Sequence, residues 1–298
     1  MTLGELIAQG AQRLRDAGVV FGHGPTNAWD EAVWLALWSL KLPLDTPVQG
    51  EDSMQNKPLT PEEYAQAATF FEARIRSRKP AAYLTQEAWL QGVSFYVDER
   101  AIVPRSLIAE VIADGSIDYW LSESTHRVLD LCTGNGSLAV IAALTYPDTE
   151  VTGADLSPDA LAVARINVDR HALQTRITLL DSDGLRAPAL QARAPFDLIL
   201  CNPPYVNAQS MAALPAEFRA EPVLALAGGS DGMDFVRTLL AEAPAVMASA
   251  GVLVLEIGNE RTFFEAAFPQ LEVVWLETSA GEDQVLLITR EALEKHPA

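Results

Sequence analysis

The sequence predicts an α/β protein with two domains, in which a smaller helical domain precedes a mostly parallel sheet covered by helices. Two observations lead to this prediction. From Val128 onward, short apolar runs alternate with segments of helical spacing, which is typical of a parallel sheet with helices on both faces. Over the first ~120 residues, apolar positions recur mainly at helical spacing instead. The length of 298 residues also fits two domains of roughly 150 residues each.

The helical domain is expected to span residues 1–115, and the stretch Asp114–Ser124 is expected to cover the join. Helices are predicted over Leu3–Ala17, over Asn27–Leu40 and from Thr60 to the basic run that ends at Lys79. Asn27 and Thr60 suit N-caps, and Glu63 occupies the capping-box position after Thr60. A short hairpin around Gln91-Gly92 is predicted to join Trp89–Leu90 to Phe95–Val97.

The second domain, residues 116–298, is predicted to alternate strands and helices. The predicted strands are Val128–Leu131, Val151–Ala154, Ile177–Leu180, Leu198–Cys201, Val252–Ile257, Val273–Leu276 and Val285–Thr289. The helices between them include Leu138–Tyr146, Pro158–Arg170 and Phe235–Ala248. In such sheets ligands bind at the carboxyl ends of the strands, so the chemistry is expected in the loops that follow them.

The charge balance favours some partners over others. Lys and Arg number 21 against 40 Asp and Glu, which gives a formal charge of −19. Such a chain is repelled by phosphate backbones, so a wide nucleic-acid surface is not expected, whereas a basic protein would be attracted. The acidity could equally serve only to keep the protein soluble.

Other compositional features point to a reduced, cytoplasmic protein. No apolar run approaches the ~20 residues that span a bilayer, and the N-terminus lacks the pattern of a signal peptide. The cysteines, Cys132 and Cys201, are too few for a disulfide framework and are expected to be small packing residues. The histidines His23, His126, His171 and His296 do not recur at metal-ligand spacing, so no metal site is predicted.

A glycine-containing loop follows the first predicted strand. The run Asp130-Leu131-Cys132-Thr133-Gly134-Asn135-Gly136 leads directly into a helix. Gly134 and Gly136 allow a tight turn and a close approach to a ligand. The third glycine of a dinucleotide-binding loop is replaced by Ala139, and a lone Gly-x-Gly can also be a plain turn.

Acidic residues after the next two strands suggest a nucleoside pocket. Asp155 ends the second strand, close to the ~20 residues after the glycine loop at which a ribose-binding acid is expected. Its alternative role is to polarise the turn before the helix that Ser157-Pro158 opens. Asp181 and Asp183 follow the third strand, and Asp183 is the better candidate to accept an adenine amino group. It could equally be a turn residue before Gly184.

The fourth strand leads into Asn202-Pro203-Pro204-Tyr205. Two consecutive prolines stiffen this loop and remove two backbone donors. The Asn202 side-chain oxygen and the Pro203 carbonyl can then hold the two hydrogens of one planar NH₂ group, which orients its nitrogen toward a methyl donor. Tyr205 offers an aromatic face to the same planar group. Asn-Pro alone is a common turn, but this run directly after a buried strand is more specific.

The loop Asp-x-Cys-Thr-Gly-Asn-Gly and the run Asn202–Tyr205 resemble those of the HemK/Prm family of glutamine methyltransferases. Further matching runs extend the resemblance over nearly the whole chain: Tyr96–Arg100, Val103–Arg105, Glu221–Pro222, Leu224–Leu226, Gly229–Gly232 and Glu256–Asn259. The N-terminal run Gly22–Ala32 resembles the PrmB-type branch, which acts on ribosomal large-subunit protein three. The other branch acts on release factors. Two departures are Ala28, where the family has proline, and Gly184, where a bulky apolar residue is usual.

The resemblance implies a Rossmann-like class I methyltransferase sheet, S-adenosylmethionine as cofactor, and a set of site residues. The cofactor-binding residues would be Asp130, Thr133, Gly134, Asn135, Gly136, Asp155, Asp183 and Asn202, and the catalytic loop would be Asn202, Pro203, Pro204 and Tyr205. Arg105 would lie near the mouth of the active site, with a salt bridge to Glu110 as the alternative. The N-terminal helices would select a basic ribosomal protein.

Three alternatives to that reading stay open in the sequence. A release factor could be the acceptor instead of the ribosomal protein. An adenine amino group presents the same planar NH₂, although a nucleic-acid methyltransferase would be expected to carry a basic groove. A non-catalytic ribosome-assembly factor could keep this fold, but the intact run Asn202–Tyr205 argues against it.

Overall fold

The computed structural model describes residues 1–295, which fold into two compact units. The first comprises Met1–Ala88 together with Leu214–Ala220, and the second comprises Trp89–Ala213 together with the described residues from Glu221 to Lys295. The division at Ala88 thus falls earlier than the predicted boundary after residue 115. The physical reason is the helix α5 (Ile108–Ala113), whose buried residues join the core under the sheet of the second unit.

The first unit is helical, as predicted. Its elements are α1 (Leu3–Asp16), α2 (Ala28–Ser39), the 3₁₀ turn η1 (Met54–Asn56), α3 (Pro61–Ser77) and α4 (Ala81–Thr85). The predicted caps are confirmed, because Asn27 accepts from two amides of α2, and Thr60 and Glu63 form a reciprocal capping box on α3.

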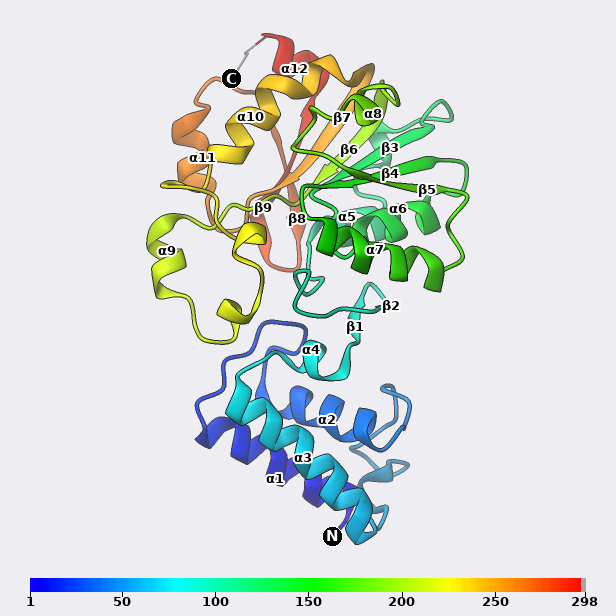
Figure 1. Cartoon of the computed structure of the whole chain (residues 1–298), viewed down its shortest axis with the longest axis vertical. Coiled ribbons are helices and arrows are strands. Elements are labelled where there is room, and N and C mark those ends of the chain that lie inside the picture. Colours follow the sequence, from blue (N-terminus) through cyan, green and yellow to red (C-terminus); the bar gives the residue numbers. More distant parts are fainter. Residues whose placement is uncertain (296–298) are drawn as a thin grey trace. The chain divides into compact units, whose positions relative to one another are not determined.

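The helices α1, α2 and α3 pack around one apolar core (Figure 1). Gly10 sits in the middle of α1, where glycine normally costs about 1 kcal/mol relative to alanine. A Cβ at this position would lie 2.4 Å from the Phe71 ring of α3. The missing side chain therefore lets Phe71, which is fully buried, pack directly on the backbone of α1.

The second unit is built on a seven-stranded sheet with the order β5-β4-β3-β6-β7-β9-β8 (Figure 1). The parallel strands are β3 (Arg127–Leu131), β4 (Glu150–Asp155), β5 (Ile177–Asp181), β6 (Phe196–Cys201) and β7 (Met247–Glu256). β9 (Gly281–Thr289) runs antiparallel to β7 and to β8 (Val274–Thr278). Each predicted strand is present, with ends shifted by a few residues.

Apolar side chains that alternate along the strands form a core on each face of this sheet. Val128, Leu198 and Val254 belong to the core that includes α5, α6 (Ser137–Thr145) and residues of α7 (Pro158–Arg170). Leu129, Ile199 and Leu253 belong to the other core, on the face covered by α8 (Pro188–Gln191), α10 (Asp234–Glu242), α11 (Arg261–Ala267) and α12 (Arg290–Lys295). The sheet is therefore covered on both faces, as expected.

Several elements of the second unit have other bounds than the sequence predicts. The predicted helix Phe235–Ala248 is wrong beyond Glu242, because Pro244 lies in the short turn η5 (Ala243–Ala245) and β7 then begins at Met247. The hairpin is formed by β1 (Ala88–Leu90) and β2 (Val93–Phe95), with Gln91 and Gly92 both at positive φ. Short turns and one helix complete the second unit: η2 (Asp118–Trp120), α9 (Ala208–Ala213) and η4 (Val223–Ala225). η3 (Phe218–Ala220) belongs to the first unit. No helix within residues 1–295 is long and apolar enough to cross a membrane.

Candidate active site

The candidate site lies at the carboxyl ends of the parallel strands, where the strand order reverses. β3 pairs with β4 on one side and with β6 on the other, so the loops after β3 and β6 flank a topological switch point. The register pairs Leu131 with Cys201, the last residues of the two strands. The glycine loop and the Asn202–Tyr205 loop therefore start side by side at one edge of the sheet.

The glycine loop is folded by contacts among its own residues. The Asp130 carboxylate accepts from the Thr133 hydroxyl and, at 2.9 Å, from the amide of Ala139 in α6. Gly134 and Gly136 have φ of 54° and 80°, and a Cβ on Gly136 would lie 3.1 Å from the Cβ of Ala164 in α7. The two glycines are thus required by the backbone conformation, and Gly136 also by close helix packing.

Asp130 is fully buried, and burial raises the pKa of its carboxyl to about 7. The bonds from Thr133 and Ala139 act in the opposite direction, since they favour the charged form. Its primary role in the structure is to hold the loop to the start of α6. Its second oxygen, Oδ1, is buried and has no hydrogen-bond partner among residues 1–295.

Asn135 carries a second buried polar atom of the glycine loop that has no hydrogen-bond partner among the described residues. Its Oδ1 accepts from the amide of Ser137, and its backbone carbonyl accepts from Asn167 at 2.8 Å. Its Nδ2 is buried without a hydrogen-bond partner in the described part of the chain. A free acceptor on Asp130 and a free donor on Asn135, beside a glycine backbone, fit a cofactor that carries both an amino acid and a nucleoside portion.

Asp155 connects the glycine loop with the loop after β4. Its Oδ2 accepts from the Gly134 amide at 2.8 Å, and its Oδ1 accepts from the Ser157 amide at 2.8 Å. Burial raises the pKa of its carboxyl, although both amides favour the ionised form. The turn role considered from the sequence is therefore present. Each carboxylate oxygen still has a further lone pair that a ribose hydroxyl could use.

The acids after β5 are placed differently. Asp181, at the end of β5, pairs in register with Asp155, so the two strand ends are neighbours. The side chain of Asp183 is 64% exposed and lies 3.3 Å from a guanidinium nitrogen of Arg186. Asp183 thus lies in the loop after β5 as predicted, but its carboxylate makes a surface ion pair.

The Asn202–Tyr205 loop is held by residues that are distant in sequence. The Tyr205 hydroxyl donates to Glu256 Oε1 at 3.2 Å. Glu256 is itself fixed, because its Oε2 accepts from the Ser106 hydroxyl and from the Leu107 amide. Burial raises the pKa values of both Tyr205 and Glu256. The predicted aromatic residue therefore has a buried carboxylate partner at the end of β7, which the sequence reading did not assign to the site.

Glycines pack directly on this loop. A Cβ on Gly258 would lie 2.5 Å from the Tyr205 ring, and a Cβ on Gly232 would lie 2.2 Å from the Tyr205 carbonyl oxygen. Both have positive φ, 54° and 82° respectively. Their runs matched the family in sequence, but only the fold shows that they seat Tyr205.

Arg105 does not form the alternative salt bridge with Glu110. Its two terminal nitrogens donate to the two carboxylate oxygens of the buried Glu221, at 2.6 and 2.8 Å. Glu221 also accepts from the Val103 amide, and Glu110 instead accepts from Ser279. The positive charge of Arg105 lowers the pKa of Tyr205, against the larger effect of burial, which raises it.

The two cysteines, both predicted to be small packing residues, differ in burial. Cys201 is buried, and burial raises the pKa of its thiol. Cys132 is only half-buried and has φ of 61°, an unusual conformation for a residue with a side chain. Within residues 1–295 no group of His, Cys, Asp or Glu is arranged to hold a metal ion. His296 lies outside the described residues.

Comparisons with known proteins identify the class as S-adenosylmethionine-dependent methyltransferases, and the strand order, the glycine loop and the proline-rich loop agree with this class. The methyltransferase small domain family matches residues 118–229. The catalytic domain of human Mettl16, solved with an RNA hairpin, has a similar fold, with a TM-score of 0.53 at 14% identity over 85% of this chain and 89% of that one.

Curated relatives identify the family. The ribosomal protein uL3 glutamine methyltransferase of Bordetella pertussis is 51% identical over 98% of this chain and 96% of its own length. The enzyme of the same name from Neisseria gonorrhoeae is 44% identical over 98% of this chain and 95% of its own length. The chain belongs to the family of ribosomal protein uL3 glutamine methyltransferases, which confirms the resemblance found in its sequence.

Proposed function

We propose that this protein transfers a methyl group from S-adenosylmethionine to the side-chain amide nitrogen of a glutamine in ribosomal protein uL3. The observation that supports this most strongly is the 51% identity over nearly the full length to an enzyme of that name. The Asn202–Tyr205 loop at the switch point of the sheet supports the same chemistry independently. A basic ribosomal protein also suits a chain with a formal charge of −19.

Residues at the ends of β3, β4 and β5 would hold the cofactor. The Gly134–Gly136 backbone would approach it closely, and Asp155 would accept from the ribose hydroxyls. The partnerless atoms of Asp130 and Asn135 would meet its polar groups, with Thr133 keeping the Asp130 carboxylate in place. Asp183 would have to turn from Arg186 toward the adenine. When bound, the cofactor supplies an electrophilic methyl group on a sulfonium.

The Asn202–Tyr205 loop would hold the glutamine amide. The Asn202 side-chain oxygen and the Pro203 carbonyl would accept from the two N–H groups, which orients the nitrogen and stabilises the positive charge that develops on it. Pro204 would keep the loop stiff, and the Tyr205 ring, seated by Gly258, would cover the planar amide. A general base is not required, because the methylated nitrogen is acidic enough to lose its proton to water.

The first unit would select the protein substrate in the cytoplasm. No broad nucleic-acid or membrane surface is proposed, because the strong negative charge repels phosphate groups. The residues 1–88 contain helices with exposed polar faces and carry none of the proposed cofactor ligands. This assignment follows the resemblance of the N-terminal run Gly22–Ala32 to the ribosomal-protein branch.

The test is a transfer assay with methyl-labelled S-adenosylmethionine and separate acceptors: free uL3, a release factor and duplex DNA. We expect label on uL3, lost when its target glutamine is replaced. Label on the release factor alone would support methyl transfer to glutamine but contradict uL3 as the acceptor. Label on DNA alone would reject the substrate class. Cofactor binding without transfer to any acceptor would support an assembly factor instead.

A further inference from the structure

A short segment of the chain leaves the catalytic unit and folds with the helical unit. Leu214–Ala220 belongs to the first unit, although the residues on both sides of it belong to the second. On one side, Val206 is fixed by hydrogen bonds with Leu226 and Gly228 directly after the Asn202–Tyr205 loop. On the other side, Glu221 holds Arg105. The segment Leu214–Ala220 therefore begins and ends close in sequence to the Asn202–Tyr205 loop.

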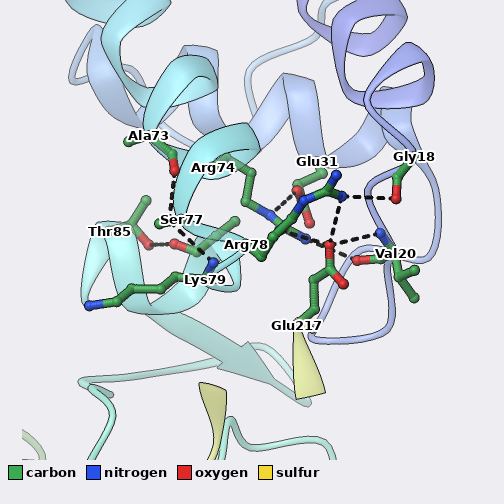
Figure 2. Close-up of polar contacts among 11 residues, drawn as sticks. Gly18, Val20, Glu31, Ala73, Arg74, Ser77, Arg78, Lys79, Thr85 and Glu217 are labelled. Atoms are coloured by element: carbon green, nitrogen blue, oxygen red, sulfur yellow. Dashed lines mark hydrogen bonds and ion pairs between the residues drawn. The ribbon is translucent and has the colours of Figure 1, made fainter. Parts of the chain in front are cut away.

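Glu217 anchors this segment in a buried ion cluster (Figure 2). Its Oε1 lies 3.3 Å from Arg78, 3.6 Å from Arg74, and 3.2 Å from the Val20 amide, which donates to it. Arg74 has no exposed surface and also donates to Glu31 at 2.7 Å. Two carboxylates thus balance two guanidinium groups, and without Glu217 the buried Arg74 and the partly exposed Arg78 would share the single carboxylate of Glu31, which leaves the cluster with an excess positive charge.

The neighbouring residue supplies a second anchor. The ring of Phe218 lies with its centroid 4.2 Å from that of His23, which is itself buried. A Cβ on Gly22 would lie 3.3 Å from the same ring, so Phe218 also packs on this glycine backbone. Consecutive residues of the segment are therefore fixed at two places: Glu217 by ion pairs with Arg74 and Arg78 at the end of α3, and Phe218 by packing on the loop that follows α1.

The helix α9 lies between the catalytic loop and this anchor. It begins at Ala208, shortly after Tyr205, and its residues are exposed except for Met211, which is half-buried. Its N-terminal end is held by Asn207, which accepts from the Ser210 amide and donates to Glu260. Residues 206–216 contain no charged side chain, in a protein rich in acids. Such a short helix without a buried face depends on its two ends for its position.

We propose that Glu217 is a positioning residue for the protein substrate: by anchoring Leu214–Ala220 it fixes α9, which contacts the polypeptide that presents the glutamine. This inference deepens the proposed function and rests on it. An uncharged, exposed helix directly after the catalytic loop suits contact with a polypeptide rather than with a charged small molecule. The anchor belongs to the first unit and the proposed cofactor ligands on β3, β4 and β5 belong to the second, so loss of the anchor should affect the acceptor and spare the cofactor.

The test compares Glu217→Gln with Glu72→Gln in the full-length protein. Glu72 lies in the same unit and pairs with Arg13 at the surface, so its variant controls for loss of one carboxylate. In Glu217→Gln we expect the KM for uL3 to rise on the order of tenfold, or about 1.4 kcal/mol. The dissociation constant for S-adenosylmethionine, measured by calorimetry, should stay within about twofold. Amide hydrogen exchange of residues 208–213 should accelerate.

An unchanged KM and unchanged exchange would overturn the proposal, as would an equal loss of cofactor affinity, which indicates general unfolding. If Glu217→Gln does not fold, Phe218→Leu removes the second anchor and leaves the ion cluster intact, and the same shifts are expected. If the wild-type protein does not methylate uL3, the proposed function fails. The exchange measurement then still decides whether Glu217 fixes α9.

Discussion

The two loops at the switch point are built on different principles. The glycine loop after β3 is held by its own neighbours, since Asp130 binds Thr133 and Ala139, and Asp155 binds Gly134. The Asn202–Tyr205 loop after β6 is seated by Glu256 and Gly258, which are far away in sequence. We therefore expect cofactor binding to be sensitive to substitutions close to the glycine loop in sequence, and the geometry of methyl transfer to be sensitive to substitutions far from the Asn202–Tyr205 loop in sequence.

The largest effect is expected from Asn202→Ala. Removing the side-chain oxygen takes away one of the two acceptors that would hold the amide, so methyl transfer should be abolished. Cofactor affinity should fall by no more than about tenfold, because a hydrogen bond contributes roughly 1 kcal/mol net. Transfer is measured with labelled cofactor and binding by calorimetry. Near-normal transfer in this variant would contradict the proposed role of the loop.

Gly258→Ala tests whether a distant residue controls the catalytic loop. The new Cβ would lie 2.5 Å from the Tyr205 ring at a φ of 54°, so the ring must move. We expect kcat for uL3 to fall by roughly a hundredfold, since small misplacements near the chemistry can cost that much. Gly92→Ala is the control, because Gly92 also has positive φ but would meet no neighbouring atom. Equal effects of the two changes would assign the loss to backbone strain alone.

Asp155→Asn tests the locally built loop. An amide can accept from only one of the Gly134 and Ser157 N–H groups and turns an NH₂ toward the other. Hydrogen bonds to charged groups contribute about 1.5–3 kcal/mol, so cofactor affinity should fall roughly tenfold to a hundredfold. At saturating cofactor kcat should change little. A fall in kcat without loss of cofactor affinity would contradict the assignment of cofactor binding to the glycine loop and of methyl transfer to the Asn202–Tyr205 loop.

The last prediction concerns the stability of the fold instead of activity, through the effect of pH on Asp130. Its pKa rises from 3.8 to about 7 on folding, so the folded state binds more protons than the unfolded state between these values. This contribution to stability is present below about pH 4 and is lost as pH rises toward 7, at no more than about 1.4 kcal/mol per pH unit. Thermal unfolding from pH 4.5 to 7.5 should therefore show a steeper decline in the wild type than in Asp130→Asn. If the stability of the wild type and of Asp130→Asn fell equally with pH, the raised pKa of Asp130 would be contradicted.

Patterns of neighbouring residues predicted most of the fold and the loops that form the candidate site. The apolar runs gave the strands of the sheet, Asn27 and Thr60 marked the starts of helices, and Asp155 was placed beside the glycine loop. These features depend on spacing within about 20 residues, which a sequence displays directly. The domain boundary was misplaced because the apolar face of α5 looks the same whether it packs on helices or on a sheet.

Other features could not be read from spacing. A salt bridge to the nearby Glu110 was the alternative that the sequence offered for Arg105, whereas the fold pairs Arg105 with Glu221, more than a hundred residues away. Gly258 and Glu256 matched a family run, yet nothing in that run shows that they seat Tyr205. The ion cluster of Arg74 and Glu217 joins segments that no periodicity connects.

From the sequence alone follow the order of strands and helices, the two loops of the candidate site and the family to which the chain belongs. The fold is needed to see which distant carboxylate and glycines contact Tyr205. It is also needed to see that Leu214–Ala220 folds with the helical unit. The physical reason is that caps, turns and strand periodicity are set by residues close along the chain. Partners of buried charges and contacts at glycines are chosen only when the packed core brings distant segments together.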